Sequence, residues 1–254
     1  MPNENNAEHF ISKLEGADTK SPVKGRGLIV EFVGPPGAGK TTNCIYFLQL
    51  FRNRGLNAYT FHDIKSFLYR LDFIERLKVY LHVITFNGSC LLSYWSLLFR
   101  HRVYSLDSFF RYVKLCVFNR ALHQFTRQHD VDVLLLDQWS IQGLWSATIF
   151  KKGATQRFQE ELRRFYFKTD YVLYFELDDD TACDRIHLRD HGKSRFDKMG
   201  KDRRLLELKR TTPYLYRLFE KSDCPNKLKF SARRSAQKNA EDFLHQLWYP
   251  HSRD

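Results

Sequence analysis

Five short apolar runs recur along this chain of 254 residues. Most are rich in β-branched or aromatic residues, and all are too short for a typical helix. Runs of this kind predict strands that are covered on both faces, as in a parallel sheet. They lie at residues 27–33, 57–62, 131–136, 171–177 and 227–232, and the last is the weakest.

The segments between these runs carry apolar residues at steps of three and four, which predicts amphipathic helices. Strand and helix in alternation predict right-handed crossovers and a doubly wound α/β sheet. Three stripes stand out: Ile64, Phe67, Leu68, Leu71, Ile74, Leu77 and Leu81; Leu106, Phe110, Val113, Val117 and Ala121; and Ala236, Ala240, Phe243 and Leu247.

Composition narrows the class of protein. Apolar residues make up 43% of the chain and aromatic residues 15%, which excludes a wholly disordered or collagen-like chain. Lys and Arg total 41 against 29 Asp and Glu, so the formal net charge is +12. Such a balance favours anionic partners, namely nucleic acid, anionic lipid or phosphorylated small molecules, without choosing among them.

The chain is predicted to hold one domain, at residues 27–249, between a polar tail at 1–26 and a short tail at 250–254. The first segment lacks the apolar run of a signal peptide. The five cysteines are scattered and none forms a C-x-x-C pair, so we expect reduced thiols and a cytoplasmic protein.

The segment from Val79 to Phe99 contains no Asp, Glu, Lys or Arg and is long enough to span a bilayer. Asn87, Gly88 and several serines and histidines within it are costly in hydrocarbon. We therefore expect buried helices that break near Gly88, with membrane-surface contact as the alternative.

A glycine-rich motif follows the first predicted strand directly and matches the P-loop pattern G-x-x-x-x-G-K-[ST]. Its glycines allow backbone amides to approach phosphate oxygens. Lys40 is expected to reach the β- and γ-phosphates of a nucleotide, and Thr41 to ligate Mg²⁺. The predicted nucleotide-binding residues are Gly34, Pro35, Pro36, Gly37, Ala38, Gly39, Lys40, Thr41 and Thr42, and a helix from Thr41 to about Arg54 should follow, stopped by Gly55.

Two acidic residues follow other predicted strands, at the edge of the sheet where ligands bind. Asp137, after four apolar residues, is predicted to orient Mg²⁺, although an Asp in this position is also a common helix N-cap. Asp63 is predicted either as a general base for an acceptor hydroxyl or as the N-cap of a helix that begins near Ile64.

A basic stretch at residues 181–200 is predicted to form a lid. Arg185 and Arg189 are four residues apart on one predicted helix face, Arg195 follows, and Gly192 gives the loop freedom to close. Guanidinium groups suit the equatorial oxygens of a transferring phosphoryl group, while a solvated basic face is the plain alternative. The three acids at 178–180 are expected to cap the helix rather than to bind metal.

The residues from Phe99 to Lys114 mix aromatic and basic side chains, a combination that can bind nucleic acid. Their helical spacing instead predicts a core stripe with a solvated face. We therefore expect no nucleic-acid partner.

Together these segments resemble the P-loop nucleoside-monophosphate kinase group, and within it the thymidylate kinases. The likeness runs from the P-loop through residues 136–140, 175–181, 185–189 and 194–197 to the last strand and helix. It implies a three-layer α/β/α sandwich with five parallel strands and a helical lid, and ATP with Mg²⁺ as donor. By position, Arg185, Arg189 and Arg195 look like the lid arginines, Arg189 also contacting the nucleotide, and Ala232 with Arg233 like the loop beside adenine.

The chain departs from thymidylate kinases at two places. Gln138 stands where the family has an arginine that holds the acceptor's phosphate, and residues 62–65 replace an Arg-Glu-Pro segment. A glutamine can donate a hydrogen bond but cannot neutralise a phosphate dianion.

The sequence therefore predicts an ATP-dependent kinase for a small acceptor, a nucleoside monophosphate such as dTMP, with residues 64–130 on the acceptor side. Lys40, Asp63, Asp137 and the lid arginines are the predicted catalytic residues, Asp63 and Gln138 bind the acceptor, and Thr41 and Asp137 hold the metal. A kinase for a nucleoside or sugar hydroxyl, with Asp63 as base, remains open. So does an ATP-binding switch without a small acceptor, and a homodimer is possible.

Overall fold

The structure is a computed structural model that describes residues 27–103, 105–149, 156–189 and 194–248. The predicted tails at 1–26 and 250–254 lie outside the described residues, as do four residues of the predicted lid, 190–193.

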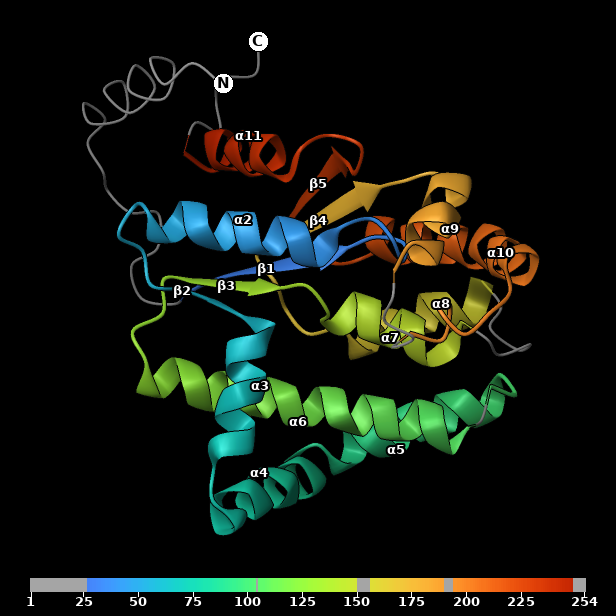
Figure 1. Ribbon diagram of the computed structural model, residues 1–254. Helices are drawn as coiled ribbons and strands as arrows, with labels where there is room; N and C mark the ends of the chain where they lie inside the picture. The colour runs from blue at the N-terminus through green and yellow to red at the C-terminus, as the bar shows by residue number, and fades with distance from the viewer. Residues whose placement is uncertain (1–26, 104, 150–155, 190–193, 249–254) are drawn as a thin grey trace.

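One parallel sheet organises the chain, with the strand order β2-β3-β1-β4-β5 (Figure 1). The central strand, β1, pairs with β3 on one side and with β4 on the other. All five predicted strands occur, which confirms the predicted α/β fold of the P-loop kinase type. The strands are β1 Leu28–Val33, β2 Ala58–Thr60, β3 Val133–Leu136, β4 Tyr171–Glu176 and β5 Asn226–Ser231.

The helices alternate with the strands and enlarge one crossover into a helical subdomain. Between β2 and β3 the chain forms α3 to α6, within the predicted acceptor-side region. The helices are α2 Lys40–Arg52, α3 Phe61–Arg70, α4 Phe73–Phe86, α5 Gly88–Arg100, α6 Leu106–Gln128, α7 Ser140–Thr148, α8 Gln156–Leu162, α9 Asp179–His187, α10 Lys201–Glu220 and α11 Ala236–Trp248, with a 3₁₀ turn, η1, at Arg163–Phe165.

Helices cover both faces of the sheet. In Figure 1, α2 and α11 lie on one face, and α3, α6 and α7 on the other. The first face is closed by aromatic rings: Phe32 of β1 contacts Phe47 of α2 at 5.1 Å, and Phe47 contacts Phe243 of α11 at 5.4 Å between centroids. These buried rings hold the helix that follows the P-loop rigidly against the sheet.

The apolar stripe from Ile64 to Leu81 does not form one helix. Asp72 accepts a hydrogen bond from the Glu75 amide (2.7 Å) and caps α4, so the chain turns between α3 and α4. Ile64 and Leu68 are buried as the stripe predicts, whereas α4 buries Val79 and Val83 instead. The prediction of one continuous core stripe was wrong, because the chain turns between α3 and α4 and a different set of apolar residues of α4 then faces the core.

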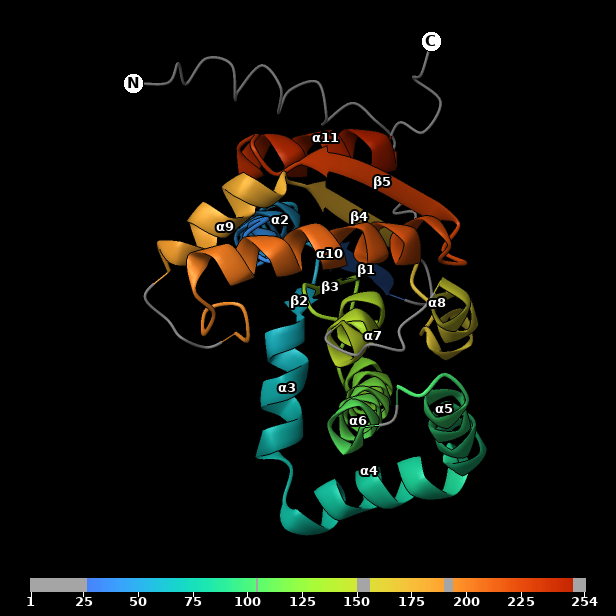
Figure 2. The same cartoon turned by 90° about the vertical axis from the view of Figure 1, so that its right-hand side faces the viewer.

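The outer face of α4 is apolar and exposed. Figure 2 shows this helix at the end of the molecule farthest from α11. The uncharged segment breaks between α4 and α5, next to Gly88 as predicted, but its first half is only partly buried: Val79 and Val83 are buried, whereas Leu81 and Ile84 are exposed. Ile74, Leu81 and Ile84 are 63%, 50% and 59% exposed. Among the described residues, no helix combines the length and the apolar character needed to cross a bilayer.

Candidate active site

The P-loop connects β1 to α2 at the carboxyl edge of the sheet, as the motif predicts. Gly37 and Gly39 have φ angles of 92° and 70°, a region that favours glycine. A Cβ on Gly37 would also lie 2.9 Å from the carbonyl oxygen of Ala182 in α9. The backbone hydrogen bonds of α2 begin at Asn43, whose amide donates to the carbonyl oxygen of Gly39 (2.9 Å). The first turn of α2 therefore points its amides toward the loop, as an anion site requires.

Lys40 folds back over this loop. Its Nζ donates hydrogen bonds to the carbonyl oxygens of Gly34 (2.7 Å) and Pro35 (3.0 Å). Burial, and to a smaller extent the nearby charge of Arg189, lower the pKa of Lys40 to about 7, while Asp137 opposes both effects. The ammonium group is thus held inside the cradle by backbone oxygens, close to one carboxylate and one guanidinium group.

Thr41 and Asp137 meet directly. The Thr41 hydroxyl donates to Asp137 Oδ2 at 2.7 Å, although the two residues are 96 positions apart in the chain. The pair forms because β1 and β3 are neighbours, which brings the start of α2 beside the end of β3. The two predicted metal ligands are thus brought together.

The pair offers hard oxygen donors of the kind that Mg²⁺ prefers. No cluster of three or more His, Cys, Asp or Glu side chains that could hold a metal occurs within the part of the chain that the structure describes. A magnesium ion here would therefore be shared between Thr41, Asp137 and phosphate oxygens of a nucleotide, which is how this ion usually binds.

Asp63 does not end the second strand, in contrast to the prediction. The strand stops at Thr60, α3 begins at Phe61, and Asp63 stands in its first turn. Asp63 Oδ2 accepts from the Thr60 amide (2.7 Å) and the Thr60 hydroxyl (2.8 Å), which makes a capping box with Thr60 as the N-cap. Asp63 still lies near the site, because Asp137 and Asp63 both add to the effect of burial in raising the pKa of the Cys44 thiol.

Arg185 contacts the P-loop and the loop after β5. Its Nη1 donates to the carbonyl oxygens of Ala232 (3.1 Å) and Gly37 (3.4 Å). The P-loop and the loop after β5 are thereby joined by one guanidinium group from α9. Arg233, next to Ala232, forms an ion pair with Asp178 at 2.6 Å. The predicted adenine-side residues therefore lie beside the P-loop.

The other two arginines of the predicted lid lie beyond the end of α9. The helix ends at His187, so Arg189 follows it instead of sharing a helix face with Arg185, as we had expected. Arg189 remains close enough to Lys40 to lower its pKa. Arg195 donates to the backbone and the hydroxyl of Ser146 in α7, and does not share the P-loop contacts of Arg185.

Gln138 is exposed just past β3. It is the residue that stands where thymidylate kinases, the family that the sequence resembles, have an arginine. Its neighbour in the sequence, Trp139, is buried. The side chain of Gln138 thus faces solvent at the carboxyl edge of the sheet, beside Asp137.

The sequence reasoning missed Glu31, a carboxylate buried in the middle of β1. Its Oε1 accepts from the amide of Ile141 (2.7 Å), at the start of α7. Burial raises the pKa of Glu31 to about 8, and the hydrogen bonds from α7 oppose this rise. A single acid in the otherwise apolar run LIVEFV was the available signal.

Two further polar residues support the P-loop, and no local pattern announced them. Gln142 of α7 accepts from the Gly34 amide through its side-chain oxygen (3.3 Å). Asn239 of α11 donates to Asn43 Oδ1 (3.2 Å), while Asn43 donates to the Gly39 carbonyl (3.0 Å). The loop is thus braced from both faces of the sheet.

Comparisons with known proteins give distant fold matches among solved structures. No protein-family model matches the chain. No curated protein matches its sequence either. Among solved structures, shikimate kinase from Acinetobacter baumannii in complex with shikimate matches 89% of this chain and 96% of that chain, with a TM-score of 0.44 and 15% identity. At this level the match says nothing about the acceptor, and the assignment of the P-loop kinase fold depends on the sheet order and the loop described above.

Proposed function

We propose that this protein is an ATP-dependent phosphotransferase that moves the γ-phosphate of ATP to a small acceptor. The observation that carries the proposal is the contact of Thr41 with Asp137 beside the cradle that holds Lys40. These are the three groups that a P-loop enzyme needs around Mg²⁺ and the β- and γ-phosphates. When bound, Mg²⁺ neutralises phosphate charge between the donor's oxygens.

The roles of the arginines follow from where they lie. Arg189, which is close enough to Lys40 to lower its pKa, stabilises the charge that develops on the transferring phosphoryl group. Arg185 positions the P-loop and the adenine-side loop, because its guanidinium donates to their backbone oxygens. It acts on the nucleotide through those loops.

We propose a nucleoside monophosphate such as dTMP as the acceptor class. Without an arginine at Gln138, its phosphate needs cations from elsewhere on the acceptor side. Arg195, which contacts α7, and Arg111 of α6 lie close together, since Arg111 lowers the pKa of Arg195 after the larger effect of burial. Arg111 is already paired with Asp107 (2.9 Å), so Arg195 is the cation that we propose to supply the charge that Gln138 lacks.

A hydroxyl acceptor, on a nucleoside or sugar, is the second candidate. It is favoured by the position of Asp63, which, like Asp137, lies near enough to Cys44 to raise the pKa of its thiol. In that reaction Asp63 would have to act as the base while its carboxylate also caps α3.

The decisive assay follows ATP consumption by the purified full chain with Mg²⁺ against a panel of nucleoside monophosphates, nucleosides and sugars. Turnover of nucleoside monophosphates supports the first candidate, and turnover of nucleosides or sugars alone supports the second. ATP hydrolysis that needs a macromolecular partner and no small acceptor would instead indicate the regulatory switch.

A substitution links this activity to the site. Lys40→Ala should lower kcat/KM by roughly 10²–10³-fold, because it removes a cation aimed at charge that develops during transfer. The matched control is Lys209→Ala, which removes an exposed lysine of α10. Thermal unfolding of both variants, measured by circular dichroism, checks that the fold persists. Equal activity of K40A and the parent protein would refute the proposed site.

A further inference from the structure

One face of α4 is apolar along the length of the helix and open to solvent. Its side chains recur at steps of three and four, which places them within about 120° of the helix circumference. They are between 43% and 78% exposed. The members of this surface, which we call the α4 stripe, are Phe73, Ile74, Leu77, Tyr80, Leu81 and Ile84.

The α4 stripe is not used to hold the fold together. Val79 and Val83, which join α4 to the core, lie on the other side of the helix. Of the sixteen large hydrophobic side chains that the described residues leave exposed, seven belong to α4. Single exposed apolar residues are ordinary, whereas a continuous stripe of them marks an interaction surface.

The position of α4 leaves this surface open to a large, flat partner. Figure 2 shows α4 lying across the end of the molecule, with α3 and α5 leading away from its two ends toward the sheet. The helix therefore meets a flat surface along its length before the rest of the fold does.

Basic side chains flank the α4 stripe. Arg76 and Lys78 lie on its two sides around the helix. Arg76 donates to two backbone carbonyls at the turn before α4 (2.7 and 3.0 Å), and Lys78 pairs with Glu75 at the exposed surface. Arg120 of α6 is also near, because its charge adds to the effect of burial in lowering the pKa of His82 in α4.

The charge of the helical subdomain selects the kind of partner. Residues 61–128 contain ten Lys and Arg against four Asp and Glu. A second copy of the chain would bring the same positive excess, which opposes self-association through this end. Anionic lipid headgroups instead attract it, and an apolar stripe between basic residues is the pattern of a helix that lies in a membrane interface.

We propose that the α4 stripe docks this protein on an anionic membrane surface. The apolar side chains enter the boundary between headgroups and acyl chains, and the flanking cations contact lipid phosphates. With 14 residues, α4 is too short to cross the hydrocarbon core, so the helix lies in the plane of the surface. The inference is independent of the proposed kinase activity.

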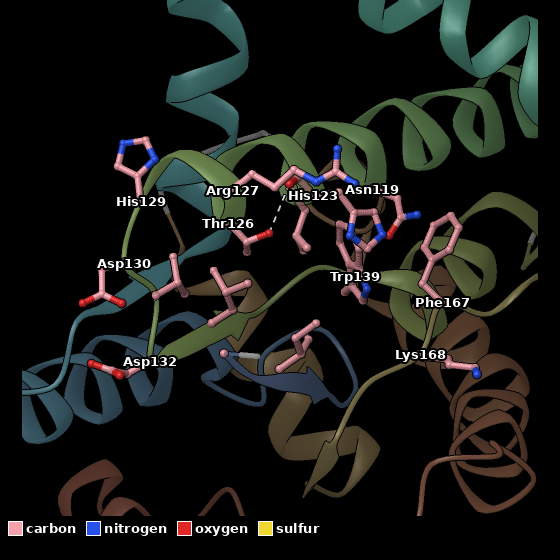
Figure 3. Close-up of a pocket in the computed structure, with 15 residues that line it drawn as sticks. Asn119, His123, Thr126, Arg127, His129, Asp130, Asp132, Trp139, Phe167 and Lys168 are labelled. Atoms are coloured by element: carbon pink, nitrogen blue, oxygen red, sulfur yellow. Dashed lines mark hydrogen bonds between the residues drawn. The ribbon is translucent and has the colours of Figure 1, made fainter. Parts of the chain in front are cut away.

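The cavity beneath α6 is a separate feature. It measures about 560 Å³ and opens between α6 and the residues that precede β1 and β3 (Figure 3). Arg127, Asp130 and Asp132 line it, and none of its lining residues within the described chain belongs to α4. Lipid binding that depends on the α4 stripe is therefore distinguishable from uptake into this cavity.

The test measures cosedimentation of the full chain with lipid vesicles. One set contains equal parts of phosphatidylcholine and phosphatidylserine, and the other contains phosphatidylcholine alone. We expect binding to the first set and a partition coefficient about tenfold or more lower for the second, because each cation near an anionic surface adds to the affinity. Added salt should weaken binding to the anionic vesicles.

A matched pair of double variants locates the contact. Leu81→Ser/Ile84→Ser removes two aliphatic side chains of the α4 stripe, and should bind anionic vesicles about tenfold more weakly than the parent. Leu188→Ser/Leu206→Ser removes two side chains outside α4 that are 83% and 67% exposed, and should bind as the parent does. Circular dichroism checks that both variants fold.

Four results would overturn the proposal. The first is a parent protein that sediments with neither vesicle set, and the second is equal binding to both sets. The third is an equal loss of binding in the two double variants, which would indicate general surface hydrophobicity. The fourth is a dimer in sedimentation velocity that L81S/I84S abolishes, because a second copy would then cover the α4 stripe.

Discussion

Lys40 is a lysine whose environment favours loss of its proton. In the structure its ammonium group donates to two loop carbonyls, yet burial and Arg189 bring its pKa to about 7. A bound triphosphate places negative charge beside the same nitrogen, which raises its pKa again. The nucleotide binding that we propose would therefore be linked to the protonation of Lys40.

This linkage predicts the pH dependence of nucleotide affinity. Below pH 7 Lys40 is protonated in both states and its contribution is constant. Above pH 7 the free protein loses the proton that the complex keeps, so affinity should fall by up to about tenfold per pH unit. Calorimetry of ATP·Mg²⁺ binding at pH 8, in buffers with different ionisation enthalpies, should register proton uptake by the parent chain. K40A should show less uptake, and equal uptake would contradict the assignment.

Asp63 offers a test at a single carboxylate. In the capping box it accepts two hydrogen bonds from Thr60. If this is its role, Asp63→Ala should cost about 0.5–2 kcal/mol of stability, as lost caps do, and change the turnover rate little. Denaturant unfolding and initial rates measured on one preparation decide the matter. A roughly hundredfold or greater loss of turnover, with stability intact, would favour the base and the hydroxyl acceptor.

Single side chains also connect whole elements around the site. Glu31 joins β1 to the start of α7, Gln142 joins α7 to the P-loop, and Arg204 of α10 donates to the carbonyls of Phe196 (2.9 Å) and Met199 (2.7 Å). These contacts position loops at the carboxyl edge of the sheet. The edge is therefore held by polar side chains from the strands and helices, in addition to the apolar core.

The ionisation of Glu31, which accepts a hydrogen bond from the start of α7, makes the stability of the folded protein depend on pH. Because its pKa is about 8 in the folded protein and about 4.5 when unfolded, the folded state binds more protons between these values, and stability should fall as pH rises from 4.5 to 8. Glu31→Gln keeps an acceptor for Ile141 without the charge. This variant should match the parent near pH 5 and be more stable by roughly 2–5 kcal/mol at pH 8.5. Denaturant melts at both pH values measure this, and parallel curves would contradict it.

The molecule as a whole has two apolar cores. Cys44 and Cys183 belong to the first and Cys116 to the second, whereas Cys90 and Cys224 are half-buried, and all five thiols are free. Burial also raises the pKa of the Cys116 thiol to about 12. Thiol reactivity therefore reports on the opening of each core.

A thiol titration tests this arrangement. With Ellman's reagent, the native protein should expose two thiols at moderate rates, and the remaining three should react only as the cores open. All five should titrate in denaturant without any reductant. Fewer than five would reveal a disulfide, and rapid reaction of all five in the native protein would contradict the buried positions.

Local patterns predicted the strands, the P-loop and the pairing of Thr41 with Asp137, because each depends on short apolar runs and on the rule that ligands bind beyond the carboxyl ends of parallel strands. The same patterns predicted one apolar stripe from Ile64 to Leu81 and one helix face for Arg185 and Arg189. Both were wrong. The turn at Asp72 and the end of α9 at His187 depend on capping and packing, which apolar periodicity does not record.

The order of residues along this chain by itself determined the fold class and the nucleotide cradle, since both follow from periodicity and from the backbone freedom of glycine. Only the tertiary structure decided that Glu31 caps α7, that Arg185 braces two loops, and that a cavity opens beneath α6. These features join residues far apart in the sequence. Their energies depend on burial and distance, which exist only after the sheet has brought the segments together.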